Sequence, residues 1–196
     1  SVVPMAGWKA YNEIIGMGAW EGRNEKDGRQ GRGEELVPWT AAPDVRAAWE
    51  WAERRWNTVS LRANSIGAYF SMLAIDRLDR ALLVSPILDM EGLILTMMGW
   101  AGVTEEELRE RGVIAASFGQ TLSWEYLCWV REHPVHSWNC PVRILYGSED
   151  NMTPRRTVEE YVRRHGAQLT VLEGGEHWFH TPEQLSALRE WEEREV

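Results

Sequence analysis

The sequence predicts an α/β fold, with a mostly parallel sheet flanked by helices on both faces. Three observations lead to this prediction. Short apolar runs recur along the chain, amphipathic helical stretches separate them, and the later runs each end in a polar or glycine-rich loop. Because parallel strands require crossover connections, this alternation favours parallel pairing. With 196 residues, of which 44% are hydrophobic, the chain is long enough for one buried core. We therefore predict a single domain over residues 1–196.

The elements before residue 80 are predicted from local periodicity. Residues 12–15 resemble a strand and 16–18 a glycine loop, but residues 20–35 are polar and lack an apolar period. Pro43 and Asp44 open a helix whose apolar positions follow a spacing of three and four up to Trp56. A β-prone run at 58–61 and an apolar helical stretch at 66–75 come next.

The second half of the chain repeats this alternation around a long interruption. The run at 81–85 predicts the next parallel strand, which Pro86 ends. Residues 89–139 then carry helical signals only, including a capping-box pair at Thr104 and Glu107. After them we predict a strand at 141–146, a helix at 154–165, a strand at 168–172 and a helix at 182–195. We expect residues 89–139 to form a helical lid inserted between two strands of the sheet.

Three polar side chains follow predicted strands in the order Ser65, Asp150 and His177. Ser65 lies between a β-prone run and a helix, with small residues two positions before and after it, as a sharp strand-to-helix turn requires. Ligand sites in open α/β sheets gather beyond the carboxyl ends of the strands, so the three loops can converge. Serine needs a base within hydrogen-bond reach, and that base needs an orienting carboxylate. The sequence therefore predicts a Ser-His-Asp triad, with Glu149 as an alternative acid and His180 as an alternative base.

These motifs resemble those of the α/β-hydrolase superfamily. The segment 63–67 is similar to the nucleophile elbow, 146–150 to the acid turn and 175–177 to the histidine loop. The wider runs 63–70 and 121–127 are similar to small bacterial members of esterase-like type. The resemblance covers most of residues 57–196, whereas the early His-Gly loop of the superfamily is missing. It implies a carboxylesterase-like serine hydrolase that cleaves a small ester or thioester through an acyl-enzyme on Ser65.

This chemistry also requires backbone donors and a cleft. The N–H groups of Ile66 and Met17 are our predicted oxyanion donors, the first at the start of the helix after Ser65 and the second in the early glycine loop. Apolar residues of the expected lid exceed what its short helices need for packing on each other, so some of them should face substrate. We name Trp124 and Met98 of the expected lid, together with Trp178 next to His177, as cleft residues.

Composition excludes several other classes. The formal net charge of −9 opposes binding to nucleic acid or to an anionic membrane surface, and no window approaches the length of an apolar membrane span. Cys128 and Cys140 have no CxxC pairing, so we predict neither a metal site nor a disulfide framework. We expect a cytoplasmic protein that needs no cofactor. The alternative from a different class is a non-catalytic α/β-hydrolase-like protein that binds a small molecule.

Overall fold

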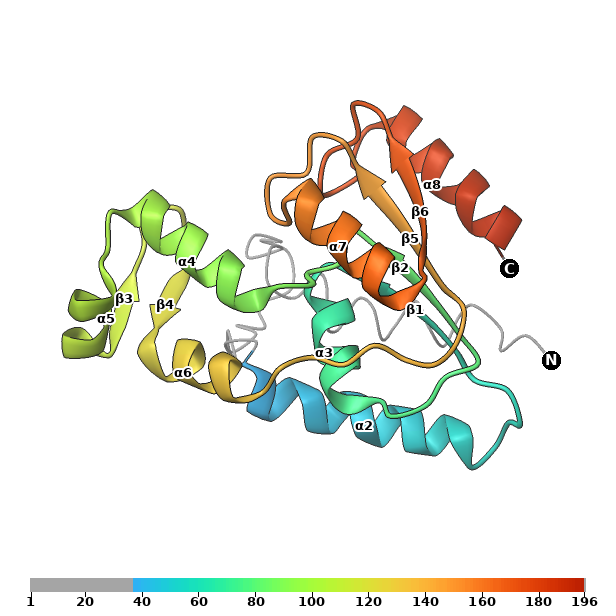
Figure 1. Cartoon of the computed structure of the whole chain (residues 1–196), viewed down its shortest axis with the longest axis horizontal. Helices are drawn as coiled ribbons and strands as arrows, with labels where there is room; N and C mark the ends of the chain where they lie inside the picture. Colours follow the sequence, from blue (N-terminus) through green and yellow to red (C-terminus); the bar gives the residue numbers. More distant parts are fainter. Residues whose placement is uncertain (1–36, 196) are drawn as a thin grey trace, which may run out of the picture.

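The computed structural model describes residues 37–195, and its main sheet contains four strands in the order β1-β2-β5-β6 (Figure 1). All neighbouring pairs in this sheet are parallel, as the sequence predicts. In the register, Asn64 lies opposite Val84, and Val84 lies opposite Leu145. The carboxyl ends of β1, β2 and β5 therefore meet at one edge. The strands are β1 (Ser60–Asn64), β2 (Arg80–Val84), β5 (Val142–Gly147) and β6 (Gln168–Leu172).

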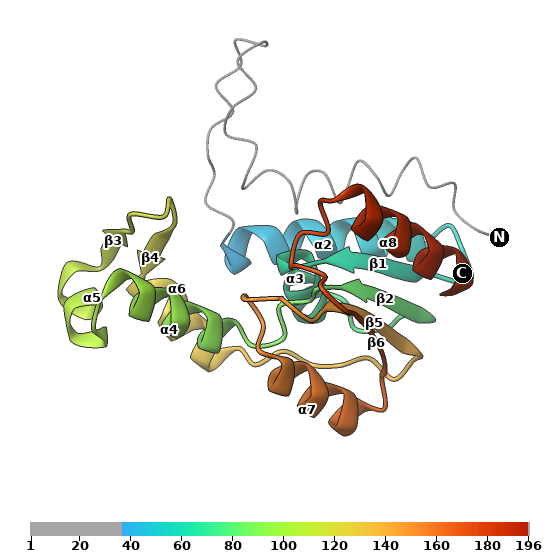
Figure 2. The same cartoon turned by 90° about the horizontal axis from the view of Figure 1, so that it is seen from above.

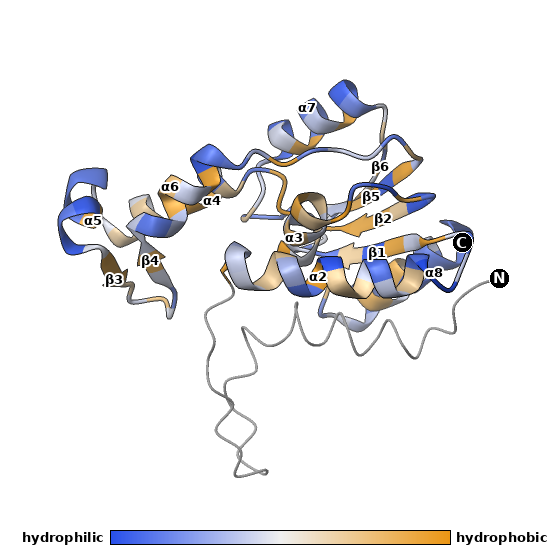
Figure 3. Cartoon of the chain, turned by 90° about the horizontal axis from the view of Figure 1, so that it is seen from below, coloured by the Kyte–Doolittle hydropathy of each residue, from blue (hydrophilic) through white to orange (hydrophobic). Residues whose placement is uncertain are grey.

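Helices cover both faces of this sheet, which confirms the predicted fold class. Alternate strand residues such as Ala63, Leu83 and Ile144 join one apolar cluster with residues of α2, α3 and α7. The intervening residues, such as Leu82 and Val84, pack instead against α8. In Figure 2 the strands lie between α7 and α8, and Figure 3 shows α3 coloured mainly hydrophobic and α7 mainly hydrophilic. The helices are α2 (Pro38–Glu53), α3 (Ile66–Ala74), α7 (Arg155–His165) and α8 (Pro182–Glu195).

Helix α2 begins earlier than the sequence predicts. Its first residue is Pro38, and Pro43 lies inside the helix rather than at its start. A proline within a helix removes one backbone donor, here the N–H that would pair with the carbonyl four residues earlier. Packing of Ala41 and Val45 in the core offsets that loss. The helix ends at Glu53, so Trp56 at the end of the predicted apolar stripe lies outside it.

Residues 89–139, called the inserted segment from here on, connect β2 to β5. The segment contains α4 (Met90–Ala101), α5 (Glu105–Arg111) and α6 (Trp124–Glu132), and the predicted capping box of α5 is present. The expectation of helices alone is wrong, because β3 (Val113–Ala115) and β4 (Thr121–Ser123) form an antiparallel hairpin. Three-residue strands are too short to show a period of two in the sequence.

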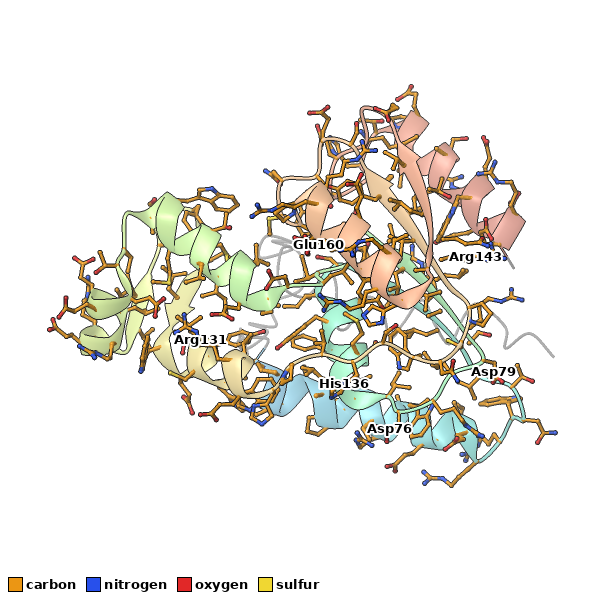
Figure 4. All side chains as sticks on the ribbon, in the orientation of Figure 1. Asp76, Asp79, Arg131, His136, Arg143 and Glu160 are labelled. Carbon is orange, nitrogen blue, oxygen red and sulfur yellow. The ribbon has the colours of Figure 1, made fainter. Side chains whose placement is uncertain are left out.

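One arginine joins the three helices of the inserted segment. Arg131 on α6, labelled in Figure 4, donates two hydrogen bonds to Glu105 on α5, at 2.8 and 2.9 Å, and one to Glu91 on α4, at 2.6 Å. Figure 2 shows the segment beyond the end of the sheet at which α3 begins. Hydrogen bonds between its own helices therefore stabilise the inserted segment. The segment lies near the carboxyl ends of the strands.

Candidate active site

Ser65 occupies the sharp turn between β1 and α3. Its φ of 50° and ψ of −123° lie in a region that L-residues rarely adopt, and the residue is 7% exposed. The backbone is held there by hydrogen bonds on both sides: the Ser65 N–H donates to Val84 O at 3.0 Å, and Ser65 O accepts from Ile87 N at 3.1 Å. This strained turn directs the serine side chain away from the strand, as a nucleophile elbow requires.

The loops after β5 and β6 bring the other two predicted side chains to Ser65. Ser65 Oγ lies 2.7 Å from His177 Nε2, and His177 Nδ1 lies 2.8 Å from Asp150 Oδ2. A carboxylate only accepts hydrogen bonds, so Nδ1 carries the ring proton and Nε2 of the neutral imidazole accepts from the serine hydroxyl. His177 is 2% exposed and Asp150 is 9% exposed, so both hydrogen bonds are shielded from water. The three groups form a continuous series in proton-transfer order.

The carboxylate has further partners that fix its orientation. Asp150 Oδ1 accepts from the backbone N–H of Met152 at 2.8 Å and of Thr153 at 3.1 Å. These two donors leave Oδ2 to face His177. The neighbouring Glu149 has an exposed side chain, so the structure places Asp150, and not Glu149, against the histidine.

The alternative base lies elsewhere. His180 is exposed, and its Nδ1 lies 3.0 Å from Glu176 Oε2. An exposed pair between residues four positions apart is a local surface contact that contributes little to stability. The structure therefore brings His177, and not His180, to the serine.

The structure describes one of the two predicted oxyanion donors, Ile66. Ile66 is the first residue of α3, where helix N–H groups lack intrahelical acceptors and the helix dipole favours negative charge. Its N–H directly follows Ser65, as an oxyanion donor in an elbow should. Met17 lies outside the described residues.

The three predicted cleft residues lie in different surroundings. Trp178 is 43% exposed, and its ring centroid lies 4.7 Å from that of His177 in an edge-on arrangement. Trp124 is half-buried at the start of α6 and packs against the main apolar cluster, and Met98 is buried within that cluster. Of the three, the structure brings Trp178 into contact with the Ser65–His177–Asp150 series.

Sequence reasoning missed Thr153, which bonds the Asp150 carboxylate, and Tyr146, which bonds Thr153. Thr153 donates its N–H to Asp150, and the Tyr146 hydroxyl donates to Thr153 O at 2.9 Å. A signal for Thr153 was present, because an aspartate commonly accepts from backbone N–H groups two and three residues later in a turn. The sequence gives no comparable sign of the Tyr146 contact, which depends on the path of the loop.

Within residues 37–195 no group of three or more His, Cys, Asp or Glu side chains is arranged to hold a metal ion. Among the same residues, none of the helices has the length and apolar character needed to cross a bilayer.

The fold is shared with solved structures, among them proteins named as a hydrolase and as an esterase domain. Est1E from Butyrivibrio proteoclasticus, solved with ferulic acid bound, has a TM-score of 0.66 at 18% identity, over 84% of this chain and 71% of its own. A protein of Agrobacterium vitis S4 named as a hydrolase has a TM-score of 0.64 at 18% identity, over 81% and 68%. The esterase domain of a Rhodothermus marinus protein has 0.54 at 12% identity, over 78% and 68%. No protein-family model and no curated protein matches the sequence. The chain thus has the α/β-hydrolase fold that the sequence predicts.

Proposed function

We propose that this chain is a carboxylesterase-like serine hydrolase that cleaves a small carboxylic ester or thioester. The observation that carries this proposal is the buried series Ser65 Oγ, His177 Nε2 and Nδ1, and Asp150 Oδ2, with consecutive distances of 2.7 and 2.8 Å. A serine in a strained turn, an imidazole in the required tautomer and an orienting carboxylate are together the arrangement used for acyl transfer. The fold shared with esterase structures supports the same class of reaction.

The geometry assigns each group a step. His177 Nε2 takes the hydroxyl proton as Ser65 Oγ forms a bond to the carbonyl carbon, and the π electrons of the carbonyl move to its oxygen. The N–H of Ile66 stabilises this oxyanion, and one such donor contributes roughly 3 kcal/mol in comparable enzymes. The oxyanion then re-forms the carbonyl as the carbon–oxygen or carbon–sulfur bond to the leaving group breaks, and the imidazolium, stabilised by Asp150, protonates the leaving oxygen or sulfur. Water repeats the sequence on the acyl-enzyme and releases the acid.

Substrate access involves the inserted segment in this proposal. Its position beyond the carboxyl ends of the strands supports a role as a lid over the site (Figure 2). The exposed indole of Trp178 beside His177 supports an apolar or aromatic acyl group near the serine. Est1E was solved with ferulic acid, so an aromatic acid ester belongs in the substrate panel beside short aliphatic esters.

The test compares the parent with Ser65→Ala on p-nitrophenyl acetate, p-nitrophenyl butyrate and methyl ferulate. Hydrolysis by the parent and a loss of at least about a thousandfold in kcat in the variant are expected. Ser186→Ala is the matched control, because Ser186 is exposed on α8 and bonds Glu190. A fluorophosphonate probe should label the parent and the control but not Ser65→Ala. Absence of both hydrolysis and labelling in the parent would instead support the non-catalytic binding protein.

A further inference from the structure

Thr153 is almost fully buried, at 2% exposure, and all three of its hydrogen-bonding groups have partners. Its N–H donates to Asp150 Oδ1 at 3.1 Å, and its hydroxyl donates to Pro86 O at 3.0 Å. Its carbonyl accepts from the Tyr146 hydroxyl at 2.9 Å. Buried groups with complete partners in a low-dielectric interior hold their geometry firmly.

The bond to Pro86 leads directly to the serine. Pro86 is followed by Ile87, whose N–H donates to Ser65 O at 3.1 Å. Two neighbouring residues after β2 thus contact both sides of the site: Ile87 holds the elbow and Pro86 holds the loop that follows β5. The path Ser65, Ile87, Pro86, Thr153, Asp150 therefore links the nucleophile to the acid without passing through the histidine.

The usual role of a threonine at this place does not account for these contacts. Thr153 comes just before α7, where a hydroxyl commonly caps the first turn of a helix. The N-cap of α7 is Pro154, and no side chain caps this helix. The Thr153 hydroxyl points back to Pro86 instead, and its β-branched side chain has few other rotamers to adopt.

Tyr146 completes the arrangement from the end of β5. Burial, and to a lesser degree the Asp150 charge, raise the pKa of Tyr146 to about 12. Its hydroxyl therefore keeps its proton at neutral pH and remains a donor to the Thr153 carbonyl.

We propose that Thr153 is a positioning residue, which fixes the Asp150 carboxylate relative to Ser65 by anchoring the acid loop to the backbone after β2. This inference rests on the proposed function, because the consequence of misplacing Asp150 is a slower reaction at Ser65. Thr153 itself touches neither the substrate nor the reacting atoms in this scheme. Its hydroxyl acts through the Thr153 N–H, which is one of two donors that set the orientation of Asp150.

The experiment compares Thr153→Val, which has nearly the same shape but no hydroxyl, with Thr153→Ser, which keeps the hydroxyl. For Thr153→Val we expect kcat on p-nitrophenyl butyrate to fall about ten- to a hundredfold, with KM within about twofold of the parent. Thr153→Ser should restore kcat to within about threefold of the parent. Thr40→Val is the control, because Thr40 is exposed on α2 and its hydroxyl donates to Val37 O, three residues earlier.

A second measurement does not depend on turnover. The His177 Nδ1–H proton that bonds Asp150 can be followed by proton NMR, with its assignment checked by loss of the signal in His177→Gln. We expect this proton to exchange faster with water in Thr153→Val than in the parent and in Thr153→Ser. If Thr153→Val unfolds, Tyr146→Phe removes only the bond to the Thr153 carbonyl and should change the same proton in the same direction.

The outcomes separate the two proposals. A parental kcat and a parental exchange rate in Thr153→Val would overturn the positioning role, as would equal impairment of Thr153→Val and Thr153→Ser. A parent that neither hydrolyses esters nor reacts with a fluorophosphonate would refute the hydrolase. In that case the exchange rate of the His177 proton still decides whether Thr153 holds Asp150.

Discussion

A methyl group added at Gly147 would collide with the loop that carries His177. A Cβ at this position falls 2.3 Å from Gly175 O and 2.5 Å from Gly175 C, whereas ordinary contact begins at 3.4 Å. The loop must therefore retreat by about 1 Å, because both clashing atoms are backbone and no rotamer change relieves them. His177 follows Gly175 by two residues, while Asp150 belongs to the loop that follows Gly147, the last residue of β5. Gly147→Ala should thus pull His177 and Asp150 apart.

A displacement of about 1 Å predicts a loss of roughly a hundredfold in kcat for Gly147→Ala. The strain should also cost about 1–3 kcal/mol of unfolding free energy, or roughly 2–4 °C of melting temperature for each kcal/mol. The assays are kcat and KM on p-nitrophenyl butyrate and thermal unfolding by circular dichroism. Gly99→Ala is the control, since a Cβ there meets nothing within 4 Å in α4, and it should leave kcat unchanged. A Gly147→Ala variant with parental kcat and melting temperature would refute this reasoning.

Three further predictions concern stability. Trp191→Ala should lower the unfolding free energy by about 3–5 kcal/mol in denaturant titration, because Trp191 is 1% exposed and fills the core between α8 and the sheet. Thr104→Ala removes the capping box of α5 and should cost about 1 kcal/mol, seen as faster amide exchange in that helix. Hydrogen bonds from Arg131 lower the pKa of Glu105 below its ordinary value of 4.5. The ion pair between Glu105 on α5 and Arg131 on α6 therefore contributes fully above pH 4.5 and is lost as the pH falls through the lowered pKa of Glu105. Amide protection factors in the inserted segment, which are corrected for the intrinsic pH dependence of exchange, should therefore fall in acid, and Arg131→Gln should already show that fall at neutral pH.

Much of the site could be predicted because its chemistry depends on short local motifs. A small-residue turn around Ser65 and loops directly after two strands are visible in the sequence, and parallel strands bring such loops to one edge. The sequence predicted Asp150 as the acid and kept Glu149 as an alternative. In the structure Asp150 makes the hydrogen bond to His177, and this contact depends on how the loop after β5 turns.

The contacts that the sequence did not reveal are those made across the fold. The hairpin of β3 and β4 is held by pairing between two three-residue strands, and neither strand has a pattern of its own. The hydroxyl of Thr153 reaches Pro86, which is 67 positions earlier, so no local rule identifies its acceptor. Helix α2 begins at Pro38, before Pro43, because the packing of the helix outweighs the preference of proline for the start of a helix.

Backbone strain in the described residues is concentrated around the candidate active site. Within residues 37–195 the non-glycine residues with positive φ are Ser65 at 50°, Ser85 at 42° and Phe179 at 45°. Ser85 precedes Pro86, which anchors the acid loop, and Phe179 follows His177 by two positions. Each such conformation costs on the order of 1–3 kcal/mol and persists only where surrounding contacts fix it. Ser85 is fully buried, and Phe179 is 2% exposed in the cluster that contains Trp191. Packing on the α8 face of the sheet therefore holds the histidine loop in its strained path, so the core there supports the geometry of the site as well as the stability of the fold.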